Sequence, residues 1–147
     1  YETLLNHPFA WESFGQKVKQ PIDFVTSALR VLTLPTKSLQ RLNRTKLRSY
    51  IAGPLSAMGQ PLFRPNGPDG WPEMSEEWVT PQGLAARLQW SMAAPSAFYR
   101  SLPDPRIFLN NALGEVADPR VRFAANSAES RREGVGLILA SPAFQRR

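Results

Sequence analysis

One segment of the sequence combines charged and aromatic side chains in a way that could bind a ligand. Residues 59–72 read GQPLFRPNGPDGWP, and Trp78 follows shortly afterwards. Arg64 and Asp69 could point into a cleft, while Trp71 and Trp78 could form a wall on which a flat ligand stacks. The full set predicted to line such a cleft is Arg64, Asp69, Trp71, Glu73, Trp78 and Arg87. The alternative is a rigid loop that packs across a helical core and binds no ligand.

A row of basic side chains forms a second candidate site. Lys37, Arg41, Arg44 and Arg48 are spaced by four, three and four residues, so one helix over residues 36–52 would carry them all on one face. Such a face could bind the phosphates of a polyanion. The same pattern is typical of the solvent side of an amphipathic helix. No aromatic side chains interleave with these basic residues, so the sequence gives no strong signal for nucleic-acid binding.

The sequence lacks the residue patterns of several catalytic classes. It has one histidine, His7, which we expect at the surface or at a cap, and it has no cysteine. It contains neither a glycine-rich phosphate loop nor a Gly-x-Ser-x-Gly turn. The acids around Glu73, Glu76 and Glu77 do not have the spacing of a calcium loop and suit the first turn of a helix. We predict no catalytic residue, metal or cofactor, and leave open whether the protein is an enzyme.

The composition is typical of one globular domain. The chain has 147 residues, of which 42% are hydrophobic and 20% charged, and its net charge is +6. No apolar run approaches the roughly 18 residues that a membrane span requires. The positive charge is concentrated in residues 36–58, which contain no acid. The length predicts a single helical domain over residues 1–147. Because the sequence begins without Met or a leader, we expect this domain to be a fragment of a larger protein.

Prolines are expected to start helices in this chain. Thr80, Asp104, Asp118 and Ser141 each precede a proline, which combines a capping side chain with a residue that fits the first helical position. A further helix is predicted from Pro21, and Ser130 and Glu133 have the spacing of a capping box.

Two further expectations concern particular helices. A helix from about Thr36 to Ala52 should stop or kink at Gly53-Pro54, and the helix after Pro81 should reach about Met92 and bury Leu84 and Leu88. The sequence predicts an all-α fold of about six or seven helices, with one long ordered loop rich in Pro, Gly and Trp.

Several of these motifs together resemble a known family. Gly59-Gln-Pro-Leu-Phe63, Pro68-Asp-Gly-Trp-Pro72 and Leu139-Ala-Ser-Pro-Ala-Phe-Gln-Arg146 are similar to the C-terminal part of a bacterial family catalogued as domain of unknown function 1800. The resemblance covers nearly the whole chain. It implies longer relatives, many of them exported, and therefore a periplasmic or exported location, with a cytoplasmic one left open. It implies no activity. Ala143 stands where relatives often have Glu.

Three functions remain as hypotheses. The first is a non-enzymatic interaction or assembly domain, whose partner is the remainder of its own larger chain or another protein, and it predicts buried aromatic side chains between residues 59 and 78. The second is part of an enzyme or ligand-binding protein, and it predicts that Arg64, Asp69 and Glu73 converge on a pocket. The third is polyanion binding through the basic row in residues 37–48.

Overall fold

Four helices of this chain begin at a proline that follows a capping side chain. The Thr80 hydroxyl accepts a hydrogen bond from Gly83 N (3.0 Å), and the carboxylates of Asp104 and Asp118 accept from the amides two residues further on (2.9 and 2.7 Å). Ser141 caps the last helix in the same manner. Because proline has no amide hydrogen, it loses nothing at the first helical position. The predicted starts at these four caps are confirmed.

The chain is all-α, as predicted. The structure is a computed structural model that describes residues 1–9, 15–34, 37, 40, 42–99 and 101–147. Its elements are α1 (Glu2–Leu5), α3 (Pro21–Val31), α5 (Arg44–Leu47), the π-helix η1 (Arg48–Ala52), α6 (Gly53–Ala57), the 3₁₀-helix η2 (Ser75–Trp78), α7 (Pro81–Phe98), α8 (Pro105–Leu113), the 3₁₀-helix η3 (Gly114–Val116), α9 (Pro119–Ser127), α10 (Arg131–Ala140) and α11 (Pro142–Gln145). Of the helices described, none is long and apolar enough to cross a bilayer.

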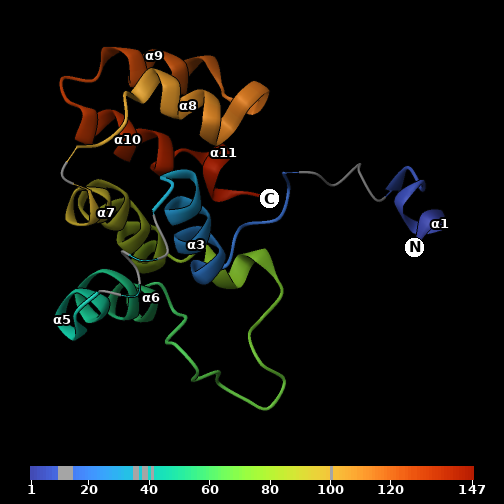
Figure 1. Cartoon of the computed structure of the whole chain (residues 1–147). Helices are drawn as coiled ribbons and strands as arrows, with labels where there is room; N and C mark the ends of the chain where they lie inside the picture. The colour runs from blue at the N-terminus through green and yellow to red at the C-terminus, as the bar shows by residue number, and fades with distance from the viewer. Residues whose placement is uncertain (10–14, 35–36, 38–39, 41, 100) are drawn as a thin grey trace.

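Helix α10 is central to the packing. It lies against α7, α8 and α9, and α7 also lies beside α6 (Figure 1). Gly136 permits the close approach of α10 to α7, because a β-carbon at this position would lie 2.4 Å from Met92 Sδ. By contrast, α1 lies apart from the other helices, and residues 1–9 are all exposed (Figure 1). The core is therefore built by the elements from α3 onward.

Aromatic side chains join α3, α7 and α11 within this core. The Phe24 ring meets the Trp90 ring edge-on at 5.2 Å between centroids, and it meets the Phe144 ring in the same way at 6.1 Å. All three side chains are buried, as are Ile138 and Leu139 of α10. Large aromatic rings bury more apolar area than any other side chain, so these contacts dominate the stability of the core.

The segment before α3 pairs with the end of the chain. Lys17 and Arg147 exchange backbone hydrogen bonds (3.3 and 2.8 Å), and Lys19 N donates to Gln145 O (2.8 Å). Asp23 at the start of α3 adds an ion pair to Arg147 at 2.9 Å. This short antiparallel pairing brings basic residues from both segments to one place.

The prediction of one continuous helix from Thr36 to Ala52 is wrong. The backbone of Asn43 is extended (ψ 160°), and its side-chain Oδ1 accepts from Lys46 N at 2.8 Å. A new helical segment therefore begins at Arg44, because an Asn side chain offers the backbone an alternative to helical hydrogen bonding. This segment runs as α5, η1 and α6 through Gly53-Pro54, where a stop or kink was expected, to Ala57.

The buried face of α7 also differs from the predicted one. Leu84 and Leu88 are 40% and 50% exposed, whereas Arg87 is 1% exposed and Ser91 is fully buried. The helix continues beyond Met92, the predicted end. Because polar side chains occupy buried positions here, the hydrophobic periodicity indicated the wrong side of this helix.

Candidate functional site

The helical segment formed by α5, η1 and α6 makes one wall of a groove. In its middle the Gly53 amide donates to Arg48 O, five residues earlier, which is the hydrogen bond of a π turn. A β-carbon on Gly53 would lie 2.8 Å from that oxygen, so the turn requires glycine at this position. Single π turns inside helical segments occur frequently at functional sites.

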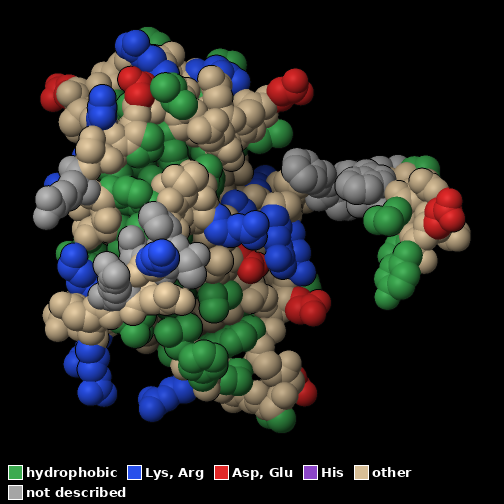
Figure 2. Space-filling view, viewed as in Figure 1, with side chains coloured by type: hydrophobic (Ala, Val, Ile, Leu, Met, Phe, Trp, Pro, Cys, Tyr) green, Lys and Arg blue, Asp and Glu red, His purple; other side chains and the backbone are tan. Residues whose placement is uncertain are grey.

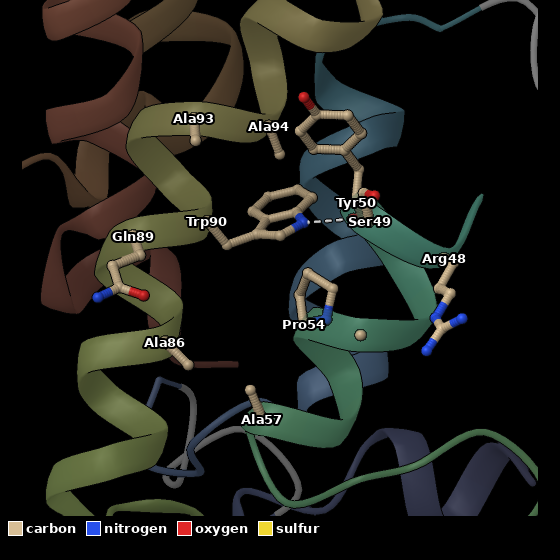
Figure 3. A pocket seen from close by; sticks show the side chains of 11 residues that line it. Arg48, Ser49, Tyr50, Pro54, Ala57, Ala86, Gln89, Trp90, Ala93 and Ala94 are labelled. Carbon is tan, nitrogen blue, oxygen red and sulfur yellow. Dashed lines mark hydrogen bonds between the residues drawn. The ribbon is translucent and has the colours of Figure 1, made fainter. Parts of the chain in front are cut away.

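Pro54 makes this wall depend on the neighbouring helix. Since proline has no amide hydrogen, the carbonyl of Tyr50, four residues earlier, has no α-helical donor. The Trp90 indole Nε1 of α7 donates to this carbonyl at 2.7 Å (Figure 3). The hydrogen bond joins the two walls and holds the Trp90 ring between them.

The space between the two walls is an apolar groove, which we call the α6/α7 groove. Its volume is about 480 Å³, and sites for small ligands generally measure roughly 300–1,000 Å³. Ala57 of α6 and Ala86 of α7 border the same space (Figure 3). Ala93 is an exposed lining residue one turn beyond Trp90. Because these side chains are small, the groove could accept a bulky side chain from another molecule.

One end of the α6/α7 groove is basic. Lys46 Nζ donates to Ala97 O at 3.4 Å, near the end of α7, where the helix carries partial negative charge. Arg44 and Arg48 are exposed, and the Arg48 side chain is directed away from Trp90 (Figure 3). Residues 42–68 contain no Asp or Glu, so this part of the surface has a positive potential.

Arg87 is a buried cation on the side of α7 that faces the core. Its Nη1 donates to Gln145 Oε1 (2.9 Å) and its Nη2 to Lys19 O (2.7 Å), and the guanidinium lies 5.4 Å from the Phe24 ring centroid. Among the described residues, no carboxylate pairs with it and its Nε has no hydrogen-bond partner. Burial lowers the pKa of Arg87 to about 10, so it is still charged at neutral pH. It also lines a small cavity of about 190 Å³ with Val79.

Tyr99 fixes the end of α7 to α3. Its hydroxyl donates to Leu32 O, and burial raises the pKa of Tyr99 to about 12. The hydroxyl therefore remains a donor throughout the physiological range. Together with Arg87, which lies within α7, it anchors this helix at two points, so the wall of the α6/α7 groove that α7 provides is fixed.

The long loop before α7 is held at its two ends. Gln60 is buried, where it accepts from Ile22 N (2.7 Å) and donates to Gln20 Oε1 (2.9 Å). Pro72 O accepts from Gln20 Nε2 and from Trp78 Nε1, both at 3.1 Å. Between these points the chain extends away from the helices (Figure 1). The predicted ordered loop is confirmed, but only its ends pack on the core.

The predicted burial of aromatic side chains in this loop is correct for Trp78 and wrong for Phe63. Trp78 is 3% exposed, and the half-buried Trp71 ring lies 6.3 Å from it. Phe63 is 94% exposed and has a φ of 57°, which non-glycine residues rarely adopt. It stands in a turn closed by a hydrogen bond from Arg64 N to Pro61 O (3.3 Å), and this turn directs the ring outward.

The six residues predicted to line a cleft lie in different environments. Arg64, Asp69 and Glu73 are exposed, and none of them lines a cavity named in this section. Trp71 and Trp78 contact each other, whereas Arg87 is buried beneath the segment before α3. Ligand binding by this loop stays a prediction without a supporting contact.

The predicted basic row is not carried by one continuous helix. Lys37 and Arg44 are exposed, but the extended backbone of Asn43 separates them. Arg41 lies outside the described residues, as do Thr36 and Leu39 of the same predicted helix. Polyanion binding through this row therefore stays a prediction.

Sequence reasoning missed the α6/α7 groove. Gly53-Pro54 predicts a helix stop or kink, although a proline inside a helix also frees the carbonyl four residues earlier for an outside donor. Tyr50 provides that carbonyl, and Trp90 was available as a donor. Ala86 and Ala93 were a further signal, since they share one face of the helix and small side chains there leave room for a partner.

The fold and the site define an all-α domain with an apolar groove between two fixed helices. In the described part of the chain, no cluster of three or more His, Asp or Glu could hold a metal ion. The chain belongs to the family described as protein of unknown function (DUF1800), whose model matches residues 1–146. The family resemblance of the sequence is thereby confirmed. No curated protein and no solved structure matches the chain.

Proposed function

We propose that this chain is a non-enzymatic interaction domain that binds an acidic polypeptide segment in the α6/α7 groove. The observation that carries the proposal is a groove of about 480 Å³ that is already open between two helices joined by the Trp90 to Tyr50 hydrogen bond. A bulky apolar side chain buried in such a groove typically provides much of the binding energy of an interface. A preformed groove also loses little conformational entropy on binding.

The charge of the surrounding surface selects the partner. Arg48 lines the groove, Arg44 and Lys46 belong to the same helical segment, and the sequence around them has no acid between residues 42 and 68. Acidic residues flanking the apolar anchor would therefore be attracted, and the complex should weaken as salt is added. The partner is the remainder of a larger chain or another protein. An exported or periplasmic location belongs to this proposal and is supported by the family resemblance alone.

A displayed library of random peptides, selected against the purified protein, tests this function. The selected peptides should share a bulky apolar residue flanked by Asp or Glu. Filling the groove by Ala93→Phe should weaken their binding by at least about tenfold, which corresponds to about 1.4 kcal/mol. The matched control is Ala85→Phe, because Ala85 is also exposed on α7 but does not line the groove.

Two outcomes would contradict this proposal. If both variants bind the selected peptides as tightly as the parent protein, the groove is not the docking site. If the selected peptides carry no excess of acidic residues, the charge argument fails even where the groove is used.

A further inference from the structure

A second cavity lies where the two ends of the helical core meet. It has a volume of about 660 Å³ and is open between the end of α8, η3 and α11. Its apolar surface includes Leu113, Val116 and Phe144. This cavity is separate from the α6/α7 groove, with which it shares no lining residue.

Three cations border this apolar surface. Lys19, Arg146 and Arg147 all line the cavity. Figure 2 shows Lys and Arg side chains gathered close to where the C-terminus lies in Figure 1. Arg147 is paired with Asp23 at 2.9 Å, whereas the guanidinium of Arg146 has no partner among the described residues. The border therefore carries more positive than negative charge.

The ammonium group of Lys19 contacts Phe144, which lines the cavity. Its Nζ donates to Phe144 O at 2.7 Å and lies 4.1 Å from the centroid of the Phe144 ring. Burial lowers the pKa of Lys19, and Arg147 adds to this effect, while Asp23 opposes it. The buried cation Arg87 donates a hydrogen bond to the backbone carbonyl of Lys19. An anion in the cavity would offset the cost of gathering these charges.

We propose that this cavity binds a small organic anion, with its negative head group between Lys19 and Arg146 and an aliphatic body against Leu113 and Val116. Guanidinium groups bind carboxylates and phosphates through two parallel hydrogen bonds, so either head group satisfies the chemistry. The concave apolar floor favours a molecule with an aliphatic body over a nucleic acid, which would need exposed aromatic side chains for stacking. Phe144 is buried and cannot stack with a base.

Binding of four aliphatic probes to the purified protein, measured by titration calorimetry below their micelle concentrations, tests the proposal. The probes are decanoate, decyl phosphate, decanol and decyltrimethylammonium. Decanoate or decyl phosphate should bind saturably at one site, and their order of affinity identifies the preferred head group. Decanol and the cationic probe should bind at least about tenfold more weakly, since neither can accept charge-assisted hydrogen bonds through an anionic head group. Equal binding of decanol, or no binding of either anion, would overturn the proposal.

Three variants locate the site. Arg146→Gln should weaken anion binding by about tenfold, and Val116→Glu, at an exposed position of the apolar floor, should abolish it. Arg120→Gln, an exposed arginine of α9 outside the cavity, removes the same charge and should leave binding unchanged. Circular dichroism establishes that each variant is folded. If Arg146→Gln and Arg120→Gln bind the anion equally, the proposed head-group position is wrong.

Discussion

Arg87 holds together segments that are far apart in the sequence. Its two terminal nitrogens reach Lys19 O before α3 and Gln145 Oε1 in α11, while the side chain itself belongs to α7. A buried guanidinium is costly to desolvate, so it persists where its planar donors meet acceptors in fixed positions. At the residue scale, the domain therefore depends on a single cation that composition alone would place at the surface.

Replacing Arg87 by Lys tests this role. A lysine has one nitrogen, which cannot donate to Lys19 O and to Gln145 Oε1 in the same planar geometry, so Arg87→Lys should lower the free energy of unfolding by about 2 kcal/mol. Urea denaturation measures the change. Arg106→Lys, at an exposed position of α8, is the matched control and should have almost no effect. Equal stability of the two variants would show that the two hydrogen bonds of Arg87 are unimportant.

The raised pKa of Tyr99 predicts a loss of stability in alkali. The ordinary pKa of tyrosine is 10.0 and that of Tyr99 is raised to about 12, so the unfolded chain releases this proton first as the pH rises. The contribution of Tyr99 is therefore complete below pH 10 and is lost as the pH approaches 12. Tyr99→Phe should be less stable at neutral pH by about 1 kcal/mol, because Leu32 O loses its donor.

The difference between the parent protein and Tyr99→Phe isolates this residue, since Tyr1 and Tyr50 are present in both. Denaturation measured from neutral to strongly alkaline pH should show the two stabilities converging above pH 10. A constant difference across that range would mean that Tyr99 titrates normally.

At the scale of an element, the π turn depends on Gly53. Its missing β-carbon is what lets Arg48 O approach, so Gly53→Ala should destabilise the protein by about 1–3 kcal/mol, although alanine is the better helix former. Gly67→Ala is the matched control, because a β-carbon there meets nothing within 4 Å. Thermal unfolding followed by circular dichroism compares them. A Gly53→Ala variant as stable as the control would contradict the close approach.

The loop before α7 presents Phe63 at some cost in stability. A left-handed backbone conformation costs an ordinary L residue about 1–2 kcal/mol, and asparagine tolerates it better than phenylalanine does. Because Phe63 buries almost nothing, Phe63→Asn should raise the free energy of unfolding by up to about 1 kcal/mol. Phe123→Asn, an exposed phenylalanine within α9, should bring no gain, and chemical denaturation compares the two.

The helix starts at capped prolines could be predicted from the sequence, while the buried face of α7 could not. Capping at Asp104 and Asp118 is local chemistry between neighbouring residues, and it is present in the structure as expected. The side of α7 that faces the core is decided by distant groups, since Arg87 is buried only because Gln145 and the segment before α3 supply acceptors. A hydrophobic pattern carries no information about such partners.

At the scale of the whole molecule, α7 connects the α6/α7 groove with the core. One side of it buries Arg87, and another borders the α6/α7 groove through Ala86 and Trp90. The sequence predicted the all-α fold and its family, but the groove arises from Pro54 and Trp90, which are 36 residues apart. No local spacing relates two such positions, so the candidate site was apparent only in three dimensions.

The indole N–H resonance of Trp90 tests the central claim most directly. It would be assigned in a two-dimensional ¹H–¹⁵N spectrum with a Trp90→Phe variant and followed while an acidic peptide selected against the protein is added. If the α6/α7 groove is the docking site, the Trp90 resonance shifts saturably and that of Trp78, which donates to Pro72 O within the loop, stays in place. A saturable complex in which the Trp90 resonance does not move would contradict the account.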